Sequence, residues 1–299
     1  MRSGGGEAMA PDGPDPQRGR LPPSQAPEGV GARSRGKDAV TTTLTLTAAE
    51  CRGVIFDMDG VVTDTARLHA RAWKQMFDDY LGRRATRRGG PFQPFDLDSD
   101  YRRYVDGRAR EDGVRSFLAS RGIRIEEGHP GDPSDRETVF GLGARKNELF
   151  LEHVRVDHAT RFEDAVDLIQ RLRGAGIRTA LISASQNARE VLAQAGVAEL
   201  FETRVDGVVA ARLGLRGKPA PDVFLEAARR LAASPAETAI LEDAVAGVEA
   251  GRAGGFRWVI GVDRSGKGDA LRRVGAHEVV RTLSEIAVQA ASSPGDVTR

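Results

Sequence analysis

The chain has 299 residues, which is enough for one or two domains with a sizeable core. Its 44 Lys and Arg residues against 43 Asp and Glu residues give a net charge of +1, and this balance argues against a dedicated nucleic-acid-binding protein. The single cysteine, Cys51, excludes an internal disulfide and a multi-cysteine metal site, and no apolar run approaches the roughly 20 residues of a membrane-spanning helix.

The amino-terminal segment, residues 1–46, is rich in Gly, Pro, Ser and Arg and almost free of large apolar side chains. Such a segment buries too little surface to offset the entropy of ordering, so we expect a disordered tail. Its arginines could contact an acidic partner, but we favour a solvated tail. Because no charged start is followed by an apolar signal region, we expect a cytoplasmic protein with neither a membrane nor a nucleic acid as partner.

A buried strand over residues 53–56 is the first regular element that the sequence predicts. The run Gly-Val-Ile-Phe is short and apolar, as in a strand covered on both faces. Asp57, Asp59 and Gly60 follow it, and in an open parallel sheet the carboxyl ends of the strands face the functional crevice. The two carboxylates are therefore candidate catalytic groups. The alternative is that they are turn residues that end the strand.

A long helical region separates this strand from the next one, which begins near Ile177. The helices are expected over residues 66–81, 111–121 and 143–154. Because the gap is too long for one crossover helix, we expect a separate helical unit, a cap over residues 66–158, inserted at the catalytic edge of the sheet. As a lid it would move on hinges near residues 62–66 and 158–162.

Strands and helices alternate after residue 162, which predicts an α/β fold with a parallel sheet covered on both faces. We expect its core to comprise residues 47–65 and 159–291. The expected strands are 178–182, 203–205, 238–241, 257–262 and 278–280. The expected helices are 163–174, 188–195, 221–231 and 245–254, with a final helix from Leu283.

Polar side chains follow the later strands at the same edge of the sheet. At Ser183, a hydroxyl and free N–H groups at a helix start would make an anion site that suits phosphoryl oxygens. The alternative is that Ser183, Ser185 and Asn187 cap the following helix. Lys218, on the proline-stiffened loop GKPAP, suits a phosphoryl oxygen and the attacking carboxylate together, and the alternative is a surface lysine.

Glu242 and Asp243 follow the strand over residues 238–241 and supply the hard oxygen ligands that magnesium prefers. The alternative, an acidic helix start favoured by the helix dipole, is compatible with metal ligation. Nucleophile, hydroxyl, cation and metal ligands would thus come from four separate strand ends, in that chain order.

Several of these motifs together carry a family resemblance. The string CRGVIFDMDGVVTDT, residues 51–65, resembles the signature of the haloacid dehalogenase-like phosphotransferases. DMDGVVTDTxxxHxxAW, LISASxN, GKPAPDVF and LEDxxAG are similar to the β-phosphoglucomutase-like subfamily, over residues 50–285. The resemblance implies a Rossmann-like core with a helical cap, Mg2+ as cofactor, and interconversion of β-glucose 1-phosphate and glucose 6-phosphate through a bisphosphate.

The roles of individual residues follow from this resemblance. Asp57 would attack a phosphoryl group and carry it as an aspartyl-phosphate, and Asp59 would be the general acid and base. Thr65 and His69 would position Asp59 and the hinge, and Trp73 would lie on the substrate side. The implied phosphate-binding residues are Ser183, Ala184, Ser185, Asn187 and Lys218, with Ser183 and Lys218 also catalytic; the implied metal site comprises Asp57, Asp59, Glu242 and Asp243.

A mutase and a phosphatase differ in their anion sites. A mutase must hold a bisphosphate with either end at Asp57, so it needs a second anion site, and it must also keep water out. Arg110 resembles the family's distal-phosphate arginine and Lys146 its lid lysine, and a guanidinium suits bidentate phosphate binding. The alternative for a lid arginine in so Arg-rich a chain is a solvated surface residue.

Three features of the lid depart from the family pattern: residues 82–108 and 122–142 look longer, and Gly113 stands where a hydroxyl residue is expected. We predict a Mg2+-dependent phosphotransferase acting on a small phosphorylated sugar, in the first place a β-phosphoglucomutase, as a monomer or weak dimer. A sugar-phosphate or small phosphomonoester phosphatase is the alternative, and a non-catalytic partner module a remote one. A dehalogenase is disfavoured because it needs neither Asp59 nor a metal.

Overall fold

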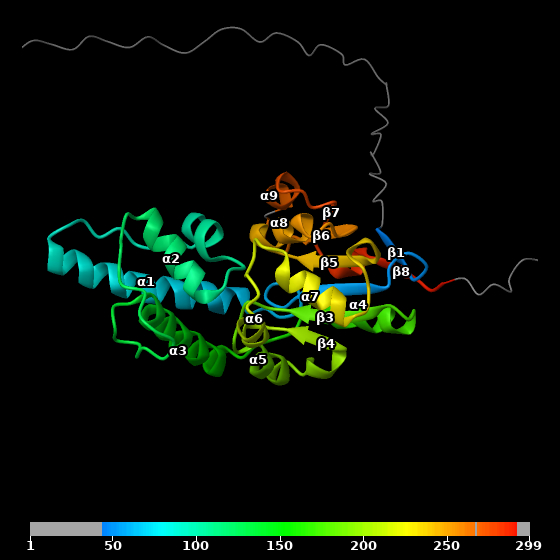
Figure 1. Ribbon diagram of the computed structural model, residues 1–299, viewed down its shortest axis with the longest axis horizontal. Coiled ribbons are helices and arrows are strands. Elements are labelled where there is room, and N and C mark those ends of the chain that lie inside the picture. Colours follow the sequence, from blue (N-terminus) through cyan, green and yellow to red (C-terminus); the bar gives the residue numbers. More distant parts are fainter. Residues whose placement is uncertain (1–43, 267, 292–299) are drawn as a thin grey trace, which may run out of the picture. The chain divides into compact units, whose positions relative to one another are not determined.

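The computed structural model describes residues 44–266 and 268–291, and its larger sheet has six parallel strands (Figure 1). The strand order is β4-β3-β2-β5-β6-β7. The bounds are β2 Gly53–Asp57, β3 Arg178–Ile182, β4 Thr203–Val205, β5 Thr238–Glu242, β6 Trp258–Val262 and β7 Glu278–Val280. The predicted α/β fold with a parallel sheet is therefore confirmed.

Helices cover both faces of this sheet. Their bounds are α4 Glu163–Gly174, α5 Ala188–Gln194, α6 Gly207–Leu213, α7 Asp222–Arg230, α8 Val245–Ala253 and α9 Gly268–Arg273, with short turns η2 Ala198–Leu200 and η3 Pro235–Glu237. Val54 and Phe56 of β2 pack in one apolar cluster with residues of α4 and α5. Ile55 packs in a second cluster with residues of α7 and α8. Because successive side chains alternate across a strand, β2 is buried on both faces.

The register of the sheet brings three strand ends together. Asp57 at the end of β2 pairs with Ile182 at the end of β3, and Phe56 pairs with Leu241 near the end of β5. The residues that follow these strands, among them Ser183, therefore project from the same edge of the sheet as Asp57.

Between β2 and α4 lie the helices α1 (Ala66–Arg88), α2 (Arg110–Ser120) and α3 (Val139–Asp157), and the π-helical turn η1 (Tyr101–Val105). α1 packs along α3, and an aromatic cluster holds α1 to α2, with the rings of Phe77 and Phe117 centred 4.1 Å apart. On this basis we propose the cap as residues 66–158 and the core as residues 47–65 and 159–291.

Helix α1 is longer than the sequence pattern predicted. It continues past Leu81 to Arg88, and four of the seven added residues are arginine, which favours helix without burying an apolar face. It ends at Gly89, whose φ of 66° is left-handed and suits glycine. The short helices α6 and α9 were not predicted.

The predicted final helix from Leu283 is wrong. A 3₁₀ turn, η4 (Leu283–Glu285), is followed by strand β8 (Ala287–Gln289), which pairs in parallel with β1 (Thr45–Thr47). Leu283 and Ile286 are both buried, and this three-residue spacing imitates a helical pattern. β1 begins inside the segment 1–46 that was predicted as a tail, and its Leu46 is buried. Residues 1–43 of that prediction lie outside the described residues.

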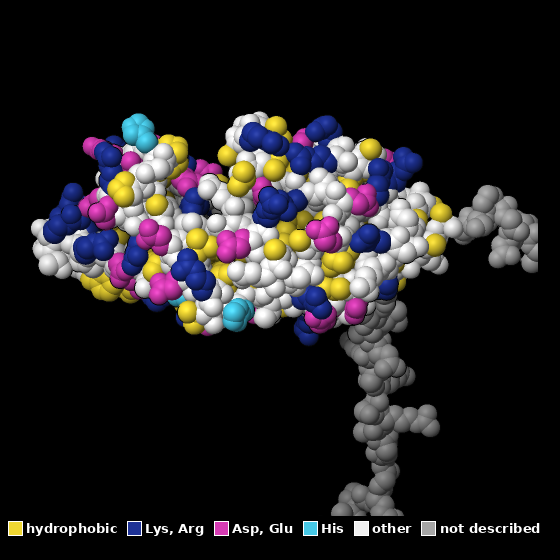
Figure 2. Space-filling model, turned by 90° about the horizontal axis from the view of Figure 1, so that it is seen from below, with side chains coloured by type: hydrophobic (Ala, Val, Ile, Leu, Met, Phe, Trp, Pro, Cys, Tyr) yellow, Lys and Arg dark blue, Asp and Glu magenta, His cyan; other side chains and the backbone are white. Residues whose placement is uncertain are grey.

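On the face shown in Figure 2, basic and acidic side chains are interspersed, in keeping with the near-zero net charge. Among the helices of the described part of the chain, none combines the length and the apolar character that a bilayer crossing requires.

Candidate active site

Asp57 and Lys218 form the buried centre of the site. The Lys218 ammonium donates to Asp57 Oδ1 at 2.6 Å and to Glu242 Oε2 at 2.7 Å. Lys218 comes from the loop that precedes α7, and its side chain is 3% exposed, so it is not the surface lysine that the sequence left open. One cation thus lies between two carboxylates, from the ends of β2 and β5.

The local charge at this centre favours a further cation. Burial, and then the charge of Glu242, raise the pKa of Asp57 well above its usual value, although Lys218 opposes this. Burial also raises the pKa of Glu242. Carboxylate oxygens of Asp57, Glu242 and Asp243 lie within 4.8 Å of one another, and hard oxygen donors at this spacing fit a divalent cation such as Mg2+.

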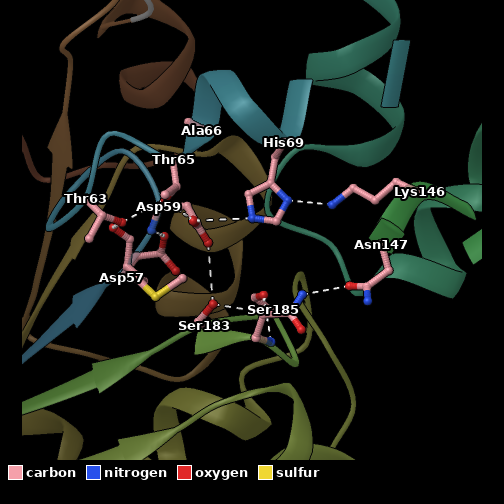
Figure 3. A network of polar contacts seen from close by, with 12 residues as sticks. Asp57, Asp59, Thr63, Thr65, Ala66, His69, Lys146, Asn147, Ser183 and Ser185 are labelled. Atoms are coloured by element: carbon pink, nitrogen blue, oxygen red, sulfur yellow. Dashed lines mark hydrogen bonds and ion pairs between the residues drawn. The ribbon is translucent and has the colours of Figure 1, made fainter. Parts of the chain in front are cut away.

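The predicted metal ligands are not equivalent in the structure. Both oxygens of Glu242 are engaged, since Oε2 accepts from Lys218 and Oε1 accepts from the backbone N–H of Ala244 at 3.1 Å. Both oxygens of Asp57 are engaged as well, since Oδ1 accepts from Lys218 and Oδ2 accepts from the backbone N–H of Asp59 at 3.1 Å. Asp57, Glu242 and Asp243 form an acidic cluster. The carboxylate of Asp59 is not part of this cluster and points instead toward Thr65 and His69 (Figure 3).

Asp59 is held by hydroxyl groups and an imidazole. The Thr65 hydroxyl donates to Asp59 Oδ1, and the Thr63 and Thr65 hydroxyls lie 2.7 Å apart. His69 Nε2 lies 3.5 Å from the same oxygen, and Ser183 Oγ donates to Oδ2 at 3.4 Å. Burial raises the pKa of Asp59, but attraction to His69 and the Thr65 hydrogen bond outweigh it and hold this pKa below its usual value.

His69 joins Asp59 to Lys146 of α3. Lys146 Nζ lies 2.5 Å from His69 Nδ1, so that nitrogen accepts a hydrogen bond from the ammonium, and Nε2 carries the ring hydrogen toward Asp59 (Figure 3). Phe150 stacks on the imidazole with ring centroids 3.9 Å apart. Burial, and then the nearby charge of Arg110, lower the pKa of Lys146 to about 7.

The loop after β3 is organised by its serines. Ser183 Oγ accepts from the backbone N–H of Ser185 at 3.0 Å, and Ser185 Oγ accepts from that of Asn187 at 3.1 Å. Asn187 is the N-cap residue of α5 by position, but its side chain makes no capping bond. Its amide donates to Asn147 Oδ1 of α3 at 2.7 Å, so it connects the core to the cap helices.

Arg110 also lies across this boundary. Its Nη2 donates to Gln186 Oε1 at 3.0 Å and its Nε donates to Glu111 Oε1 at 3.0 Å.

A Cβ at Gly113 would lie 3.0 Å from the indole of Trp73, so the glycine makes room for that ring where a hydroxyl residue was expected.

A cavity of about 600 Å³ collects most of the predicted residues. Those that line it are Asp57, Asp59, His69, Trp73, Arg110, Lys146, Ser183, Ala184, Ser185, Asn187, Lys218 and Asp243. Thr65 and Glu242 lie behind this lining and contact it. Sequence reasoning missed Thr63 and Gln186: Thr63 acts through Thr65, and Gln186 is recognisable only once Arg110 faces it.

Comparison with known proteins places this geometry in a family. Residues 51–255 match the haloacid dehalogenase-like hydrolase family. The β-phosphoglucomutase of Mycobacterium bovis is 49% identical over 238 residues, covering 79% of this chain and 91% of that protein. The chain belongs to the haloacid dehalogenase-like family, in its β-phosphoglucomutase-like branch.

One further relative agrees with this assignment, and a solved structure shares the fold. The β-phosphoglucomutase of Bacillus subtilis is 30% identical over 80% of this chain and 92% of that protein. A crystal structure of β-phosphoglucomutase from Clostridium difficile superposes with a TM-score of 0.60 at 24% identity, covering 79% of this chain and 92% of that one, and supports the fold. The haloacid dehalogenase-like fold that the motifs predicted is therefore confirmed.

Proposed function

We propose that this protein is a Mg2+-dependent β-phosphoglucomutase that interconverts β-glucose 1-phosphate and glucose 6-phosphate through an aspartyl-phosphate on Asp57. One observation carries the proposal. A single cavity has Asp57, Ser183 and Lys218 from the core and Arg110 and Lys146 from the cap on its walls. A bisphosphate needs cationic groups at both of its ends, and this lining offers them.

The proposed chemistry begins at the buried carboxylate. An oxygen of Asp57 attacks phosphorus, the bond from phosphorus to the sugar oxygen breaks, and the proton on Asp59 passes to that oxygen. In the second half, a sugar hydroxyl attacks the aspartyl-phosphate, its proton passes to Asp59, and Asp57 is released as a carboxylate. The low pKa of Asp59 suits this second half, because the group is then available as a base.

Asp57 and Asp243, with Glu242 beside them, would hold the metal. When bound, Mg2+ supplies charge that offsets the repulsion between the attacking carboxylate and the phosphoryl oxygens. Lys218 contributes a second positive charge, and Glu242 orients it by accepting a hydrogen bond from its ammonium group at 2.7 Å. The Ser183 hydroxyl lines the cavity and donates to Asp59 Oδ2. It can donate to a phosphoryl oxygen instead once that hydrogen bond is broken.

A sugar-phosphate phosphatase on the same residues is the second candidate, and the hydrolase description of the matched family favours it. Water would then replace the sugar hydroxyl as acceptor. The burial of Asp57 and Lys218 supports the mutase, since solvent reaches the nucleophile poorly with the cap in contact with the core.

The test uses the purified full chain with Mg2+, β-glucose 1-phosphate and a trace of glucose 1,6-bisphosphate. Glucose 6-phosphate is followed by a coupled dehydrogenase and free phosphate by a colorimetric assay, with Asp57→Asn as the inactive control. The proposal expects glucose 6-phosphate in large excess over phosphate. Phosphate as the main product would instead establish the phosphatase.

A further inference from the structure

Arg264, on the loop after β6, contacts the turn that carries Asp59. Its Nε donates to the carbonyl of Gly60 at 3.1 Å and its Nη2 to that of Val61 at 3.3 Å. The same guanidinium donates from Nη1 and Nη2 to the two oxygens of Asp164 at 3.0 and 2.8 Å. One planar guanidinium therefore makes four N–H···O contacts and joins the turn at residues 60–61 to Asp164, which is far from that turn in the chain.

The turn at Gly60 is fixed from its other side by the acidic cluster. Gly60 has a φ of 85°, and a Cβ at this position would lie 2.1 Å from Asp243 Oδ2. The backbone that follows Asp59 is thus confined between Asp243 and Arg264. Any movement of this turn would change the position of the Asp59 carboxylate relative to Asp57.

Arg264 also contacts the two connections between core and cap. Its guanidinium lies over the ring of Phe162, 3.8 Å from the centroid. The Phe162 N–H donates to the carbonyl of Val62 at 2.9 Å, so the outgoing and returning connections are hydrogen-bonded to each other beneath this arginine. Asp164, at the start of α4, accepts in addition from the Thr282 hydroxyl and the Leu283 N–H, which anchors the ion pair to the core.

We propose that Arg264 is a positioning residue that holds the Asp59 turn and the paired cap connections in the geometry for phosphoryl transfer to sugar rather than to water. The proposal rests on the proposed function. In the step concerned, the bond between phosphorus and Asp57 breaks, the acceptor oxygen bonds to phosphorus, its proton passes to Asp59, and Asp57 returns to a carboxylate. Without Arg264 the turn and the connections loosen, so transfer slows and water competes as acceptor.

The experiment compares Arg264→Ala and Arg264→Lys with Arg171→Ala. Arg171 is a matched control, because its Nη1 also donates to a backbone carbonyl, that of Ile286 at 2.7 Å, away from the Asp59 turn. For Arg264→Ala we expect kcat to fall by about 10- to 100-fold with KM changed by less than about 3-fold, and the ratio of free phosphate to glucose 6-phosphate to rise. Added guanidinium ion restores part of kcat in Arg264→Ala only.

Arg264→Lys keeps the charge but cannot span both carbonyls and the carboxylate, so we expect an intermediate loss. If Arg264→Ala does not fold, Arg264→Lys and Asp164→Asn carry the test with the same readouts. A lowered Tm with kcat and product ratio like those of Arg171→Ala would overturn the proposal. If the wild-type enzyme forms no glucose 6-phosphate, the mutase function fails, and Arg264 is judged on kcat for phosphate release alone.

Discussion

The ammonium nitrogen of Lys146 lies 2.5 Å from Nδ1 of His69, whose other ring nitrogen lies 3.5 Å from Asp59. A cap helix is thereby connected, through one imidazole, to the carboxylate that we propose moves protons. Lys146 is buried and the side chain of His69 is only 15% exposed, so the protonation of each is sensitive to any charge that enters the cavity.

Lys146 is expected to take up a proton when a phosphorylated sugar binds. Its pKa of about 7 leaves it largely neutral at pH 8, and the negative charge of the ligand raises that pKa. Calorimetric titrations in buffers of different ionisation enthalpy measure the uptake, which should be larger at pH 8 than at pH 6, where the lysine is already charged. Lys146→Met should abolish the excess at pH 8; an excess that persists in this variant would contradict the assignment.

Lys218→Met is expected to destabilise the protein by about 3 kcal/mol at pH 7.5, because two buried carboxylates lose their shared cation. Asp57 and Glu242 have folded pKa values raised above their unfolded ones. A carboxyl group with a raised folded pKa favours the folded state at pH values below its unfolded pKa, and this contribution is lost as the pH rises through its folded pKa. Loss of Lys218 raises the folded pKa of both carboxyl groups further. The stability difference between Lys218→Met and the wild type should therefore shrink toward pH 5, where both groups become protonated.

Urea unfolding at the two pH values measures this deficit. Lys74→Met is the matched control, since Lys74 pairs with Asp78 at a more exposed position and should cost no more than about 1 kcal/mol. An equal deficit for Lys218→Met at pH 5 and pH 7.5 would exclude charge repulsion as its cause.

Saturating Mg2+ is expected to raise the Tm of the protein by about 3 °C or more, because the ion binds the folded acidic cluster and offsets its repulsion. Asp243→Asn should remove most of this rise. Asp222→Asn, which alters an acidic residue paired with Arg216 outside the cluster, should keep it. A rise that is the same in all three proteins would mean that Mg2+ acts elsewhere.

Gly113→Ser is expected to lower both stability and activity. The new Cβ would lie 3.0 Å from the Trp73 indole, which stacks on Phe77 and has little room to move. Overpacking of this kind costs about 1–3 kcal/mol, more than the gain in helix propensity. Gly174→Ala is the control, because no heavy atom lies within 4 Å of its added Cβ. Thermal unfolding and KM for β-glucose 1-phosphate are the measurements, and an unchanged KM would show that Trp73 does not shape the sugar site.

The arrangement of the strand ends could be predicted because it follows from a few local rules. Parallel strands deliver their carboxyl ends to one edge, so Asp57, Ser183 and Asp243 had to converge once the strands were recognised. The bounds of β3 and α4 follow equally from local pattern, since apolar period and turn residues agree there.

Other contacts depend on approaches between distant segments that no local pattern encodes. Gln186 faces Arg110 only after the cap folds over the core, and Arg264 meets Gly60 across the sheet edge. The pairing of β1 with β8 joins the two ends of the described chain, and each strand has three residues, too few for a period to stand out.

Trapping the covalent intermediate tests the central claim most directly. The enzyme is mixed with Mg2+ and glucose 1,6-bisphosphate, quenched in acid within milliseconds, digested and analysed by mass spectrometry. We predict a phosphoryl group on the peptide that contains Asp57, lost in Asp57→Asn and retained in a variant of an exposed acidic residue outside the cavity, such as Asp269→Asn. A phosphoryl group on another residue, or transfer that continues in Asp57→Asn, would contradict the account.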